Sequence, residues 1–341
     1  MGSKITEMSA APLITVMIPC FNQAPVIERA LESVLQQSYK HFEVIISDDC
    51  SNDNTREVVT SFIESCDLPD HQIRYFRNEV NLGYLQNYHH TLFTRARGDW
   101  TINLDGDDFF IDNNFFQNAV SKINHNPTAN LLCANYKEFH SDQNTWIPVK
   151  NNLPPMMSSS QFLALYGRGE VLWNHNALLY KTSTAIKIGF YWDKNKYKND
   201  WESFLKLATT GDIIFYDSYV SAWVQHSNNL TGGTSLMKFK NNFFLIQGLR
   251  DYMILQDINI AVRRRLHFYL IKINIEGPAT LILRKKEYIK FMHLLLISIQ
   301  KFKFYAVLVL LNPVIWLKFF VALNPSIYFA IKKMKRRSNE L

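Results

Sequence analysis

Cysteine is scarce in this chain, with only four among 341 residues, at Cys20, Cys50, Cys66 and Cys133. They form no Cys-x-x-Cys pair and have no histidine-rich partner spacing, which argues against a zinc site. Such sparse use is typical of a reducing compartment. Residues 1–12 are small and polar and lack the apolar stretch of a secretory signal. We therefore expect the N-terminal half to be cytosolic.

The chain also lacks basic residues interleaved with aromatic ones on one surface, the pattern that would favour a nucleic-acid binder. Lysine and arginine number 37 against 30 acidic residues, for a net charge of +7. This excess allows an anionic partner, such as a nucleotide-sugar or an anionic membrane. The basic residues gather late in the chain, at 263–265, 284–286 and 332–337.

No internal repeat or low-complexity segment is evident. Hydrophobic residues make up 47% of the chain and charged residues 20%, so it can bury a sizeable core and is not disordered. Its length allows two domains, or one large domain with an appendage.

A long uninterrupted apolar run is missing as well. Residues 302–331 are almost wholly apolar, but Asn312-Pro313, Lys318 and Asn324-Pro325 divide them into pieces shorter than the roughly 20 residues of a spanning helix. We favour short helices in a membrane interface, with the basic tail facing anionic lipid. Proline is tolerated in membrane helices, so one kinked span stays open. A helical bundle packed on the rest of the protein, or a dimer interface, also stays open.

The N-terminal third alternates between apolar runs and amphipathic stretches. Expected strands are 14–18, ended by Pro19, then 42–47, 73–76 and a fourth ending at Asp105; expected helices begin near Pro25, after an Asp53 N-cap, and at 84–95. This alternation predicts a parallel sheet with right-handed crossovers. Residues 151–155 and 158–160 read as loops, 201–207 as a short helix, and the chain from about 238 onward as helical.

Three carboxylates lie within four residues, at Asp105, Asp107 and Asp108, directly after the apolar stretch 100–104. Carboxylates this close raise one another's pKa unless a cation neutralises them. Hard divalent cations take such oxygen ligands, and the carboxyl end of a strand is where an open α/β sheet binds its ligand. An acidic turn bent at Gly106 is the simpler alternative.

Several segments in order resemble the family 2 glycosyltransferases, which have the GT-A fold. The resemblance covers about 12–233 and rests on these motifs: Pro19-Cys20-Phe21-Asn22, the helix end 33–39, Asp48-Asp49-Cys50-Ser51-Asn52-Asp53-Asn54-Thr55, Asn81-Leu82-Gly83, Leu104-Asp105-Gly106-Asp107-Asp108, Asn199-Asp200-Trp201-Glu202, and Trp223-Val224-Gln225-His226 with Asn229-Leu230-Thr231. Two positions depart from the usual pattern: Phe21 replaces tyrosine and Cys50 replaces glycine. Both lie near the expected nucleobase pocket, so uridine is the default base and thymidine remains possible.

The resemblance implies a metal-dependent enzyme that uses a nucleoside diphosphate sugar. The implied nucleotide-binding residues are Pro19, Phe21, Asn22, Asp49, Gly83, Asp105 and Asp107. Asp107 and Asp108, with His226 as a third ligand, would hold Mn²⁺ or Mg²⁺, and a purely structural role for His226 stays open. Asp53 more simply caps a helix.

Asp200 is the expected general base. Its segment opens a helix, whose amide dipoles favour a nearby negative charge and help to keep Asp200 ionised. One base and one leaving-group metal suggest direct displacement with inversion at the anomeric carbon. Glu202 could substitute, but it should point away from Asp200.

The expected fold is therefore an α/β GT-A (Rossmann-like), mostly parallel sheet flanked by helices, followed by an α-helical C-terminal region. Expected domains are a flexible 1–12, a catalytic domain at 13–235 (nucleotide half 13–110, acceptor half 111–235) and a helical, membrane-associated 236–341. The protein would act on a glycan or lipid-linked acceptor in surface-polysaccharide synthesis, at the cytoplasmic face of the inner membrane and without nucleic acid, and could form homo-oligomers through its C-terminal helices. The competing hypothesis is a non-catalytic nucleotide-sugar or glycan-binding subunit that retains the fold.

Overall fold

The computed structural model of the chain describes residues 11–69, 72–191, 200–226, 236–284 and 287–302. The chain divides into two compact units, Met1–Ser227 and Asn228–Leu341, called here the N-terminal and C-terminal units. The domain boundaries expected from the sequence remain predictions.

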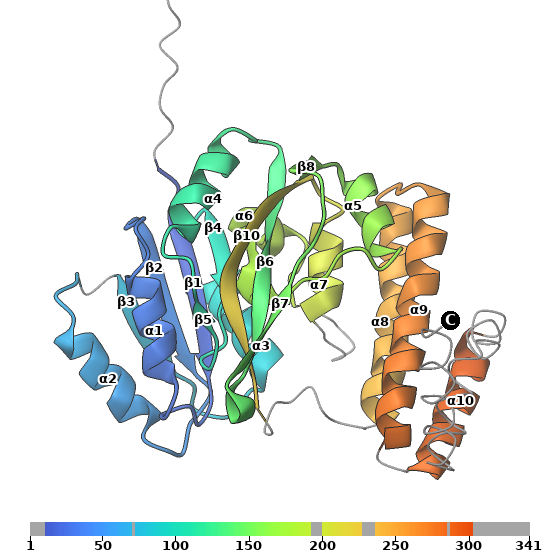
Figure 1. Cartoon of the computed structure of the whole chain (residues 1–341), viewed down its shortest axis with the longest axis horizontal. Helices are drawn as coiled ribbons and strands as arrows, with labels where there is room; N and C mark the ends of the chain where they lie inside the picture. Colours follow the sequence, from blue (N-terminus) through green and yellow to red (C-terminus); the bar gives the residue numbers. More distant parts are fainter. Residues whose placement is uncertain (1–10, 70–71, 192–199, 227–235, 285–286, 303–341) are drawn as a thin grey trace, which may run out of the picture. The chain divides into compact units, whose positions relative to one another are not determined.

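The N-terminal unit is built on one sheet, which has ten strands within the described ranges (Figure 1). The strand order is β3-β2-β1-β4-β9-β6-β10-β5, with β7 added to β6 and β8 to β10. The bounds are β1 Ile14–Cys20, β2 Phe42–Asp48, β3 Ile73–Arg77, β4 Trp100–Asn103, β5 Phe109–Phe110, β6 Ala129–His140, β7 Thr145–Val149, β8 Met156–Met157, β9 Leu178–Lys181 and β10 Asp212–Gln225.

Strand direction differs between the two ends of the sheet. The first four strands in sequence, β3, β2, β1 and β4, are all parallel neighbours. Beyond them β9 runs antiparallel to both β4 and β6, while β10 is parallel to β6. The expected mostly parallel sheet is thus found in the first half, and the second half is mixed. The carboxyl ends of β1, β2 and β4 meet at one edge.

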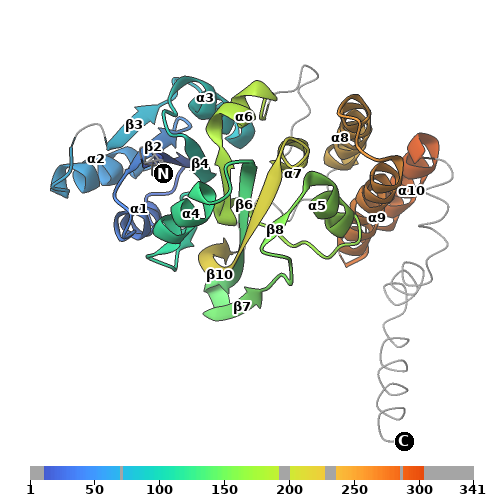
Figure 2. The same ribbon diagram turned by 90° about the horizontal axis from the view of Figure 1, so that it is seen from above.

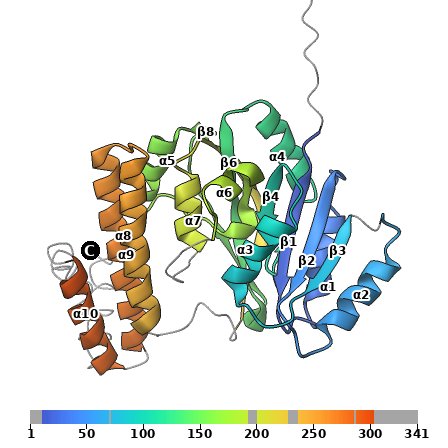
Figure 3. The same ribbon diagram turned by 180° about the vertical axis from the view of Figure 1, so that it is seen from behind.

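Helices cover both faces of this sheet, with α1 and α4 on one face and α3 and α6 on the other (Figure 2). Seen from behind, α3 lies across the strands near α6 and α7 (Figure 3). The helices are α1 Ile27–Leu35, α2 Thr55–Ser65, α3 Tyr84–Thr94, α4 Phe115–Asn124, α5 Ser159–Tyr166, α6 Thr182–Lys187 and α7 Asp200–Leu207, with short 3₁₀ turns η1 Ser141–Gln143 and η2 His175–Ala177.

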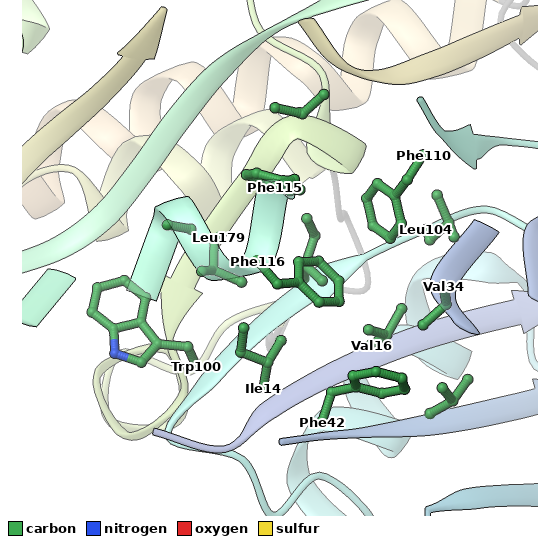
Figure 4. Packing of buried hydrophobic residues seen from close by; sticks show 14 of the residues in the cluster. Ile14, Val16, Val34, Phe42, Trp100, Leu104, Phe110, Phe115, Phe116 and Leu179 are labelled. Carbon is green, nitrogen blue, oxygen red and sulfur yellow. The ribbon is translucent and has the colours of Figure 1, made fainter. Parts of the chain in front are cut away.

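The core lies between the sheet and helices α1 and α4. Alternate residues of β1, Ile14 and Val16, point toward this layer because side chains alternate between the faces of a strand. They meet Val34 of α1 and the paired rings of Phe115 and Phe116 at the start of α4 (Figure 4). All five side chains are fully buried, and each contributes roughly 1.5–3 kcal/mol relative to exposure. This packing fixes the edge at which β1, β2 and β4 end.

Several expected boundaries were wrong by a few residues. Pro19 does not end β1, which continues to Cys20, because β4 pairs only as far as Met17 and a missing N–H is tolerated there. Pro25 lies before α1 rather than in its first turn. The N-cap of α2 is Asn54, although Asp53 accepts the Thr55 amide at 3.0 Å.

Two further boundaries differ. The fourth strand ends at Asn103 and not at Asp105. Residues 159–160 are helical because Ser158 caps α5 in a capping box with Gln161.

The described part of the C-terminal unit is all-helical, as expected. It contains α8 Leu236–Leu255, α9 Ile260–Arg284 and α10 Tyr288–Phe302, with α9 packed against both of the others. Within the described residues, no helix combines the length and apolar character needed to cross a membrane. The apolar stretch from 303 to 331 and the basic tail after it lie outside the described residues.

Candidate functional site

The loops after β1 and β2 are tied together at the carboxyl edge of the sheet. The Asn22 amide donates to the Ser51 hydroxyl at 2.9 Å, and the Asn22 side chain accepts the Asn52 amide at 2.8 Å. Asn22 has a positive φ of 54°, a conformation that asparagine tolerates better than most residues. Phe21 beside it is 44% exposed, so a large ring stands open to solvent at this edge.

Asp49 is almost fully buried and anchors the next loop along this edge. Its carboxylate accepts the amides of Leu82 and Gly83, both at 2.8 Å, and the Asn78 side chain at 2.9 Å. Gly83, with φ of 80°, is the N-cap of α3 and needs the freedom of glycine. Asp49 therefore positions Gly83, and a direct contact from Asp49 to a nucleobase stays a prediction.

Cys50 stands where the resemblance expects glycine, and its φ is 67°. A left-handed conformation costs a residue with a Cβ roughly 1–2 kcal/mol. The thiol contacts the Glu79 carbonyl at 3.5 Å, which is a weak compensation. The departure from glycine therefore leaves local strain beside Asp49.

A histidine links Asp105 to Asp200. The Nε2 atom of His175, in η2, lies 3.2 Å from Asp105, and its Nδ1 atom lies 3.6 Å from Asp200 at the start of α7. Burial lowers the pKa of His175, but the two carboxylates outweigh burial and raise it well above its ordinary value. Burial raises the pKa of Asp105, but His175 more than offsets it, so the net shift is downward.

Asp107 has a different partner. Its carboxylate lies 3.0 Å from Nε2 of His226, just after β10, and its backbone carbonyl accepts a hydrogen bond from Arg29 at 2.9 Å. Burial and the nearby Asp105 raise the pKa of Asp107, although the His226 contact opposes the shift. Arg29 also stacks over Phe109 at 4.2 Å, which holds the acidic loop against α1.

Asp108 is buried and fixed on both sides. One oxygen accepts the Val224 amide of β10 at 2.8 Å, and the other accepts the Asn176 side chain at 2.9 Å. Burial, followed by repulsion from Asp105 and Asp107, raises the pKa of Asp108 well above its usual value. Among the described residues, no cationic side chain lies within ion-pair distance of Asp108, although Arg29 and His175 act on its carboxylate from farther away.

Three side chains of the site lie close enough together to hold a metal ion. One ligand atom each from Asp105, Asp108 and His175 lie within 4.8 Å of one another, and this group could hold a metal. The sequence prediction chose Asp107, Asp108 and His226 instead, so Asp108 is common to both sets. At Gly106 a Cβ would meet the Oε1 atom of Gln23, and that flexible side chain would have to shift.

Helix α3 connects the two halves of the site. The amide of its N-cap, Gly83, binds Asp49, and the hydroxyl of Tyr88 donates to Asp105 at 2.8 Å. Asp105 in turn reaches Asp200 through His175. The predicted residues of the acidic loop, the Gly83 loop and α7 thus share one network. Glu202 pairs with Lys206 one turn along α7, at 2.5 Å.

Sequence reasoning missed His175, Tyr88 and Asn176. Tyr88 and His175 come from segments that carry no acidic motif. The one available signal was the polar run Asn174-His175-Asn176 directly before the buried strand at 178–181, because polar residues at a strand start are unusual in a core. Of the other predicted residues, Pro19 lies in β1 and pairs with Ser47 of β2.

The fold and the site together define a Rossmann-like α/β protein with an acidic cluster at the carboxyl edge of its sheet. The family model described as glycosyl transferase family 2 matches residues 15–185. The chain belongs to this family.

Two curated relatives differ in how much they cover. The uncharacterized protein MT1568 of Mycobacterium tuberculosis (strain CDC 1551 / Oshkosh) is 35% identical over 272 residues, covering 76% of this chain and 81% of that protein. A Campylobacter jejuni GalNAc(5)-diNAcBac-PP-undecaprenol beta-1,3-glucosyltransferase is 35% identical over 98 residues, 28% of this chain and 30% of that protein. The chain spans less than two fifths of several curated relatives, including this one.

Two solved structures share the fold. Staphylococcus aureus TarS 1–349 in complex with UDP-GlcNAc has a TM-score of 0.65 at 14% identity, covering 95% of this chain and 92% of that chain. The mannosyltransferase PcManGT from Pyrobaculum calidifontis in complex with GDP-Man and Mn²⁺ has a TM-score of 0.53 at 15% identity, covering 94% and 83%. The predicted family and GT-A fold class are therefore confirmed.

Proposed function

We propose that this protein is a metal-dependent, inverting glycosyltransferase that moves a sugar from a nucleoside diphosphate donor to a glycan or lipid-linked acceptor in surface-polysaccharide synthesis. One observation carries the proposal: His175 lies 3.2 Å from Asp105 and 3.6 Å from Asp200, so the acidic loop and the candidate base share one site.

Mn²⁺ or Mg²⁺ would be held by Asp107 and Asp108, with His226 as the third ligand. Asp107 lies 3.0 Å from His226, and Asp108 is buried with no ion-pair partner in the described part of the chain, so these side chains offer a compact set of donor atoms. When bound, the ion would neutralise charge on the departing diphosphate. PcManGT was solved with Mn²⁺, which supports an ion of this kind.

The nucleotide would lie along the edge formed by the loops after β1 and β2. Exposed Phe21 offers a ring face, and Pro19 and Asn22 shape the loop that carries it. Asp49 and Gly83 would bound the base and ribose, and Asp105 would face the ribose. The TarS complex with UDP-GlcNAc supports a uridine donor.

Asp200 would accept the proton of the acceptor hydroxyl. It is the first residue of α7, where helix amides favour its negative charge, and one of its oxygens accepts the Trp201 amide at 2.8 Å. The His175 imidazole holds the second oxygen toward the acidic loop. A base on the side of the sugar opposite the leaving group predicts inversion.

The acceptor would reach the site at the cytoplasmic face of the inner membrane. Helix α10 supports this location with four exposed apolar side chains at helical spacing, 289, 292, 296 and 299, on a strongly basic unit. Such a stripe suits a lipid interface flanked by cationic residues. The alternative is that this apolar face of α10 packs against a second copy of the protein in a homo-oligomer.

The test is release of nucleoside diphosphate from a panel of nucleotide sugars, with Mn²⁺ and with EDTA. We expect release from a uridine donor that needs the metal and falls at least 100-fold in Asp107→Ala and in Asp200→Ala. Equal release by both variants and the unaltered protein would end the proposal. A folded protein that binds the donor but releases nothing with any candidate acceptor would favour the non-catalytic subunit.

Two further measurements refine the mechanism. Proton NMR of the product reports the anomeric configuration, and retention contradicts the assignment of Asp200. The metal ligands are compared with His226→Gln and His175→Gln. A larger rise in the Mn²⁺ concentration needed by His226→Gln supports the set chosen here, and the reverse order favours Asp105, Asp108 and His175.

A further inference from the structure

A hollow of about 340 Å³ lies on the second half of the sheet, outside the site described above. Its lining residues within the described ranges are Ile111, Lys137 of β6, Trp146 of β7 and Tyr219 of β10. Trp146 is 45% exposed, which is unusual for the largest apolar side chain. The volume is within the range of small-ligand sites.

The lining combines two aromatic rings with one cation. The ammonium of Lys137 lies 5.9 Å from the Trp146 ring centre and 5.4 Å from that of Tyr219. In the part of the chain that the structure describes, Lys137 forms no ion pair, whereas Lys150 lies 3.8 Å from Asp217. The ammonium of Lys137 thus contacts two ring faces and has no ion-pair partner among the residues that the structure describes.

Irregular strand pairing occurs beside the residues that line the hollow. Register shifts between β10 and β6 flank Tyr219 on both sides, and such bulges re-aim side chains and occur next to active sites. Trp146 pairs with Phe139, whose ring lies 4.6 Å away, so the indole is braced from behind.

A single residue, Phe109, lies between the hollow and the acidic loop. Phe109 directly follows Asp108, and its ring meets that of Trp146 edge-on at 6.0 Å. The hollow therefore lies next to the loop on which the proposed reaction depends.

We propose that this hollow binds an anionic sugar unit of the acceptor glycan, one that carries a carboxylate or a phosphate. The apolar C–H face of a pyranose ring can cover Trp146, as aromatic rings with a polar rim commonly allow. Its charged group would pair with Lys137. The identity of the ligand as acceptor rests on the proposed function, but the binding of an anionic sugar does not.

The binding test uses protein labelled with ¹⁵N in its tryptophan side chains. The Trp146 indole signal is assigned with Trp146→Phe and followed during titration with glucose, glucuronic acid, glucose 6-phosphate and inorganic phosphate. We expect at least one acidic sugar to bind at least fivefold more tightly than glucose, and Lys137→Gln to abolish that preference. The stronger of the two acidic sugars distinguishes a carboxylate from a phosphate.

Three outcomes would overturn the proposal: no sugar shifts the Trp146 signal, glucose binds as tightly as the acidic sugars, or inorganic phosphate binds as tightly as glucose 6-phosphate. Lys150→Gln is the matched control, since it removes a lysine that already has a partner. Ile147→Ala, at the neighbouring position on the opposite face of β7, controls for changes to the strand. Lys137→Gln should leave metal-dependent donor hydrolysis unchanged. If the unaltered protein binds an acidic sugar but hydrolyses no donor, the proposed function fails and the binding proposal stands.

Discussion

The two units of this protein carry opposite charge. Residues 1–227 contain 18 lysines and arginines against 25 acidic residues, a net charge of −7, whereas residues 228–341 contain 19 against 5, a net charge of +14. The overall value of +7 conceals this division. Average charge therefore says little about partners, because the acidic unit and the basic unit suit different ones.

Acidity in the N-terminal unit is concentrated where it is costly. Asp108 is almost fully buried and Asp107 lies beside it, and burial, followed by repulsion from neighbouring carboxylates, raises the pKa of both. Basicity in the C-terminal unit lies on the surface, with Arg264 and Arg265 exposed on α9. A buried cluster of like charge suits a small cation, while an exposed cluster suits an extended anionic surface.

The largest effect is expected when the charge of Asp200 in the N-terminal unit is removed, because this tests whether the acidic unit carries the reaction. We expect Asp200→Asn to lower kcat by about 10²- to 10⁴-fold, because the base is lost. Donor and Mn²⁺ affinity should change little, since Asp200 does not touch the proposed ligands of the ion. Steady-state kinetics with matched Mn²⁺ titrations measure both, and a lost Mn²⁺ affinity with unchanged kcat would contradict the assignment.

The basic unit is tested with lipid vesicles. We expect Arg264→Gln combined with Arg265→Gln to weaken binding to anionic vesicles about 30-fold, from about 1 kcal/mol per charge. Sedimentation of vesicles with and without phosphatidylserine measures the change. Binding that is insensitive to salt and to lipid charge would contradict it.

The control for this experiment comes from the acidic unit. Arg56→Gln with Lys187→Gln removes two exposed charges there and should leave vesicle binding unchanged. Leu296→Gln, on the apolar stripe of α10, should weaken binding to neutral and anionic vesicles alike.

A smaller effect is expected at Cys50. Cys50→Gly should stabilise the N-terminal unit by about 0.5–1 kcal/mol, because relief of the left-handed strain exceeds the added entropy of the unfolded chain. Urea unfolding followed by circular dichroism measures it. Cys50→Ala keeps the Cβ and should gain nothing, so an equal gain in both variants would point to the thiol instead.

The smallest expected effect is a pH dependence of the stability that His175 contributes. It is measured in EDTA by comparing the urea midpoints of unaltered protein and His175→Gln. The pKa of His175 is raised in the folded state, so its stabilisation is complete below about 6.5 and declines as pH rises through the higher folded value. The pKa of Asp105 is lowered, so the contact also weakens as pH falls below about 3.8. Urea midpoints should therefore differ most between these two limits, and a difference that grows above pH 7 would have the wrong sign.

Local patterns predicted much of this molecule. Alternating periodicity located β1 to β4 and α1 to α3 because each is a short, strongly patterned element with its own turn residues. The strand order in the mixed second half of the sheet could not be predicted in this way. There β9 lies between β4 and β6, although about 80 residues of sequence separate it from β4. Pairing over that distance depends on tertiary packing and leaves no local pattern.

The site divides in the same manner. Asp105, Asp107, Asp108 and Asp200 stand in acidic motifs and could be chosen from sequence. His175 could not, because a single histidine gains meaning only when the fold places it between two carboxylates. Asp49 was chosen as a ligand contact, which stays a prediction, whereas its role in holding the loop around Gly83 depends on tertiary hydrogen bonds that no local pattern revealed.

Electron paramagnetic resonance of Mn²⁺ tests the main claim most directly, because it counts bound ion without requiring the sugar or acceptor. Unaltered protein with UDP should bind about one equivalent, and Asp108→Ala should lose it while Asp200→Asn retains it. Equal binding by unaltered protein and Asp108→Ala would show that the acidic loop does not capture the ion.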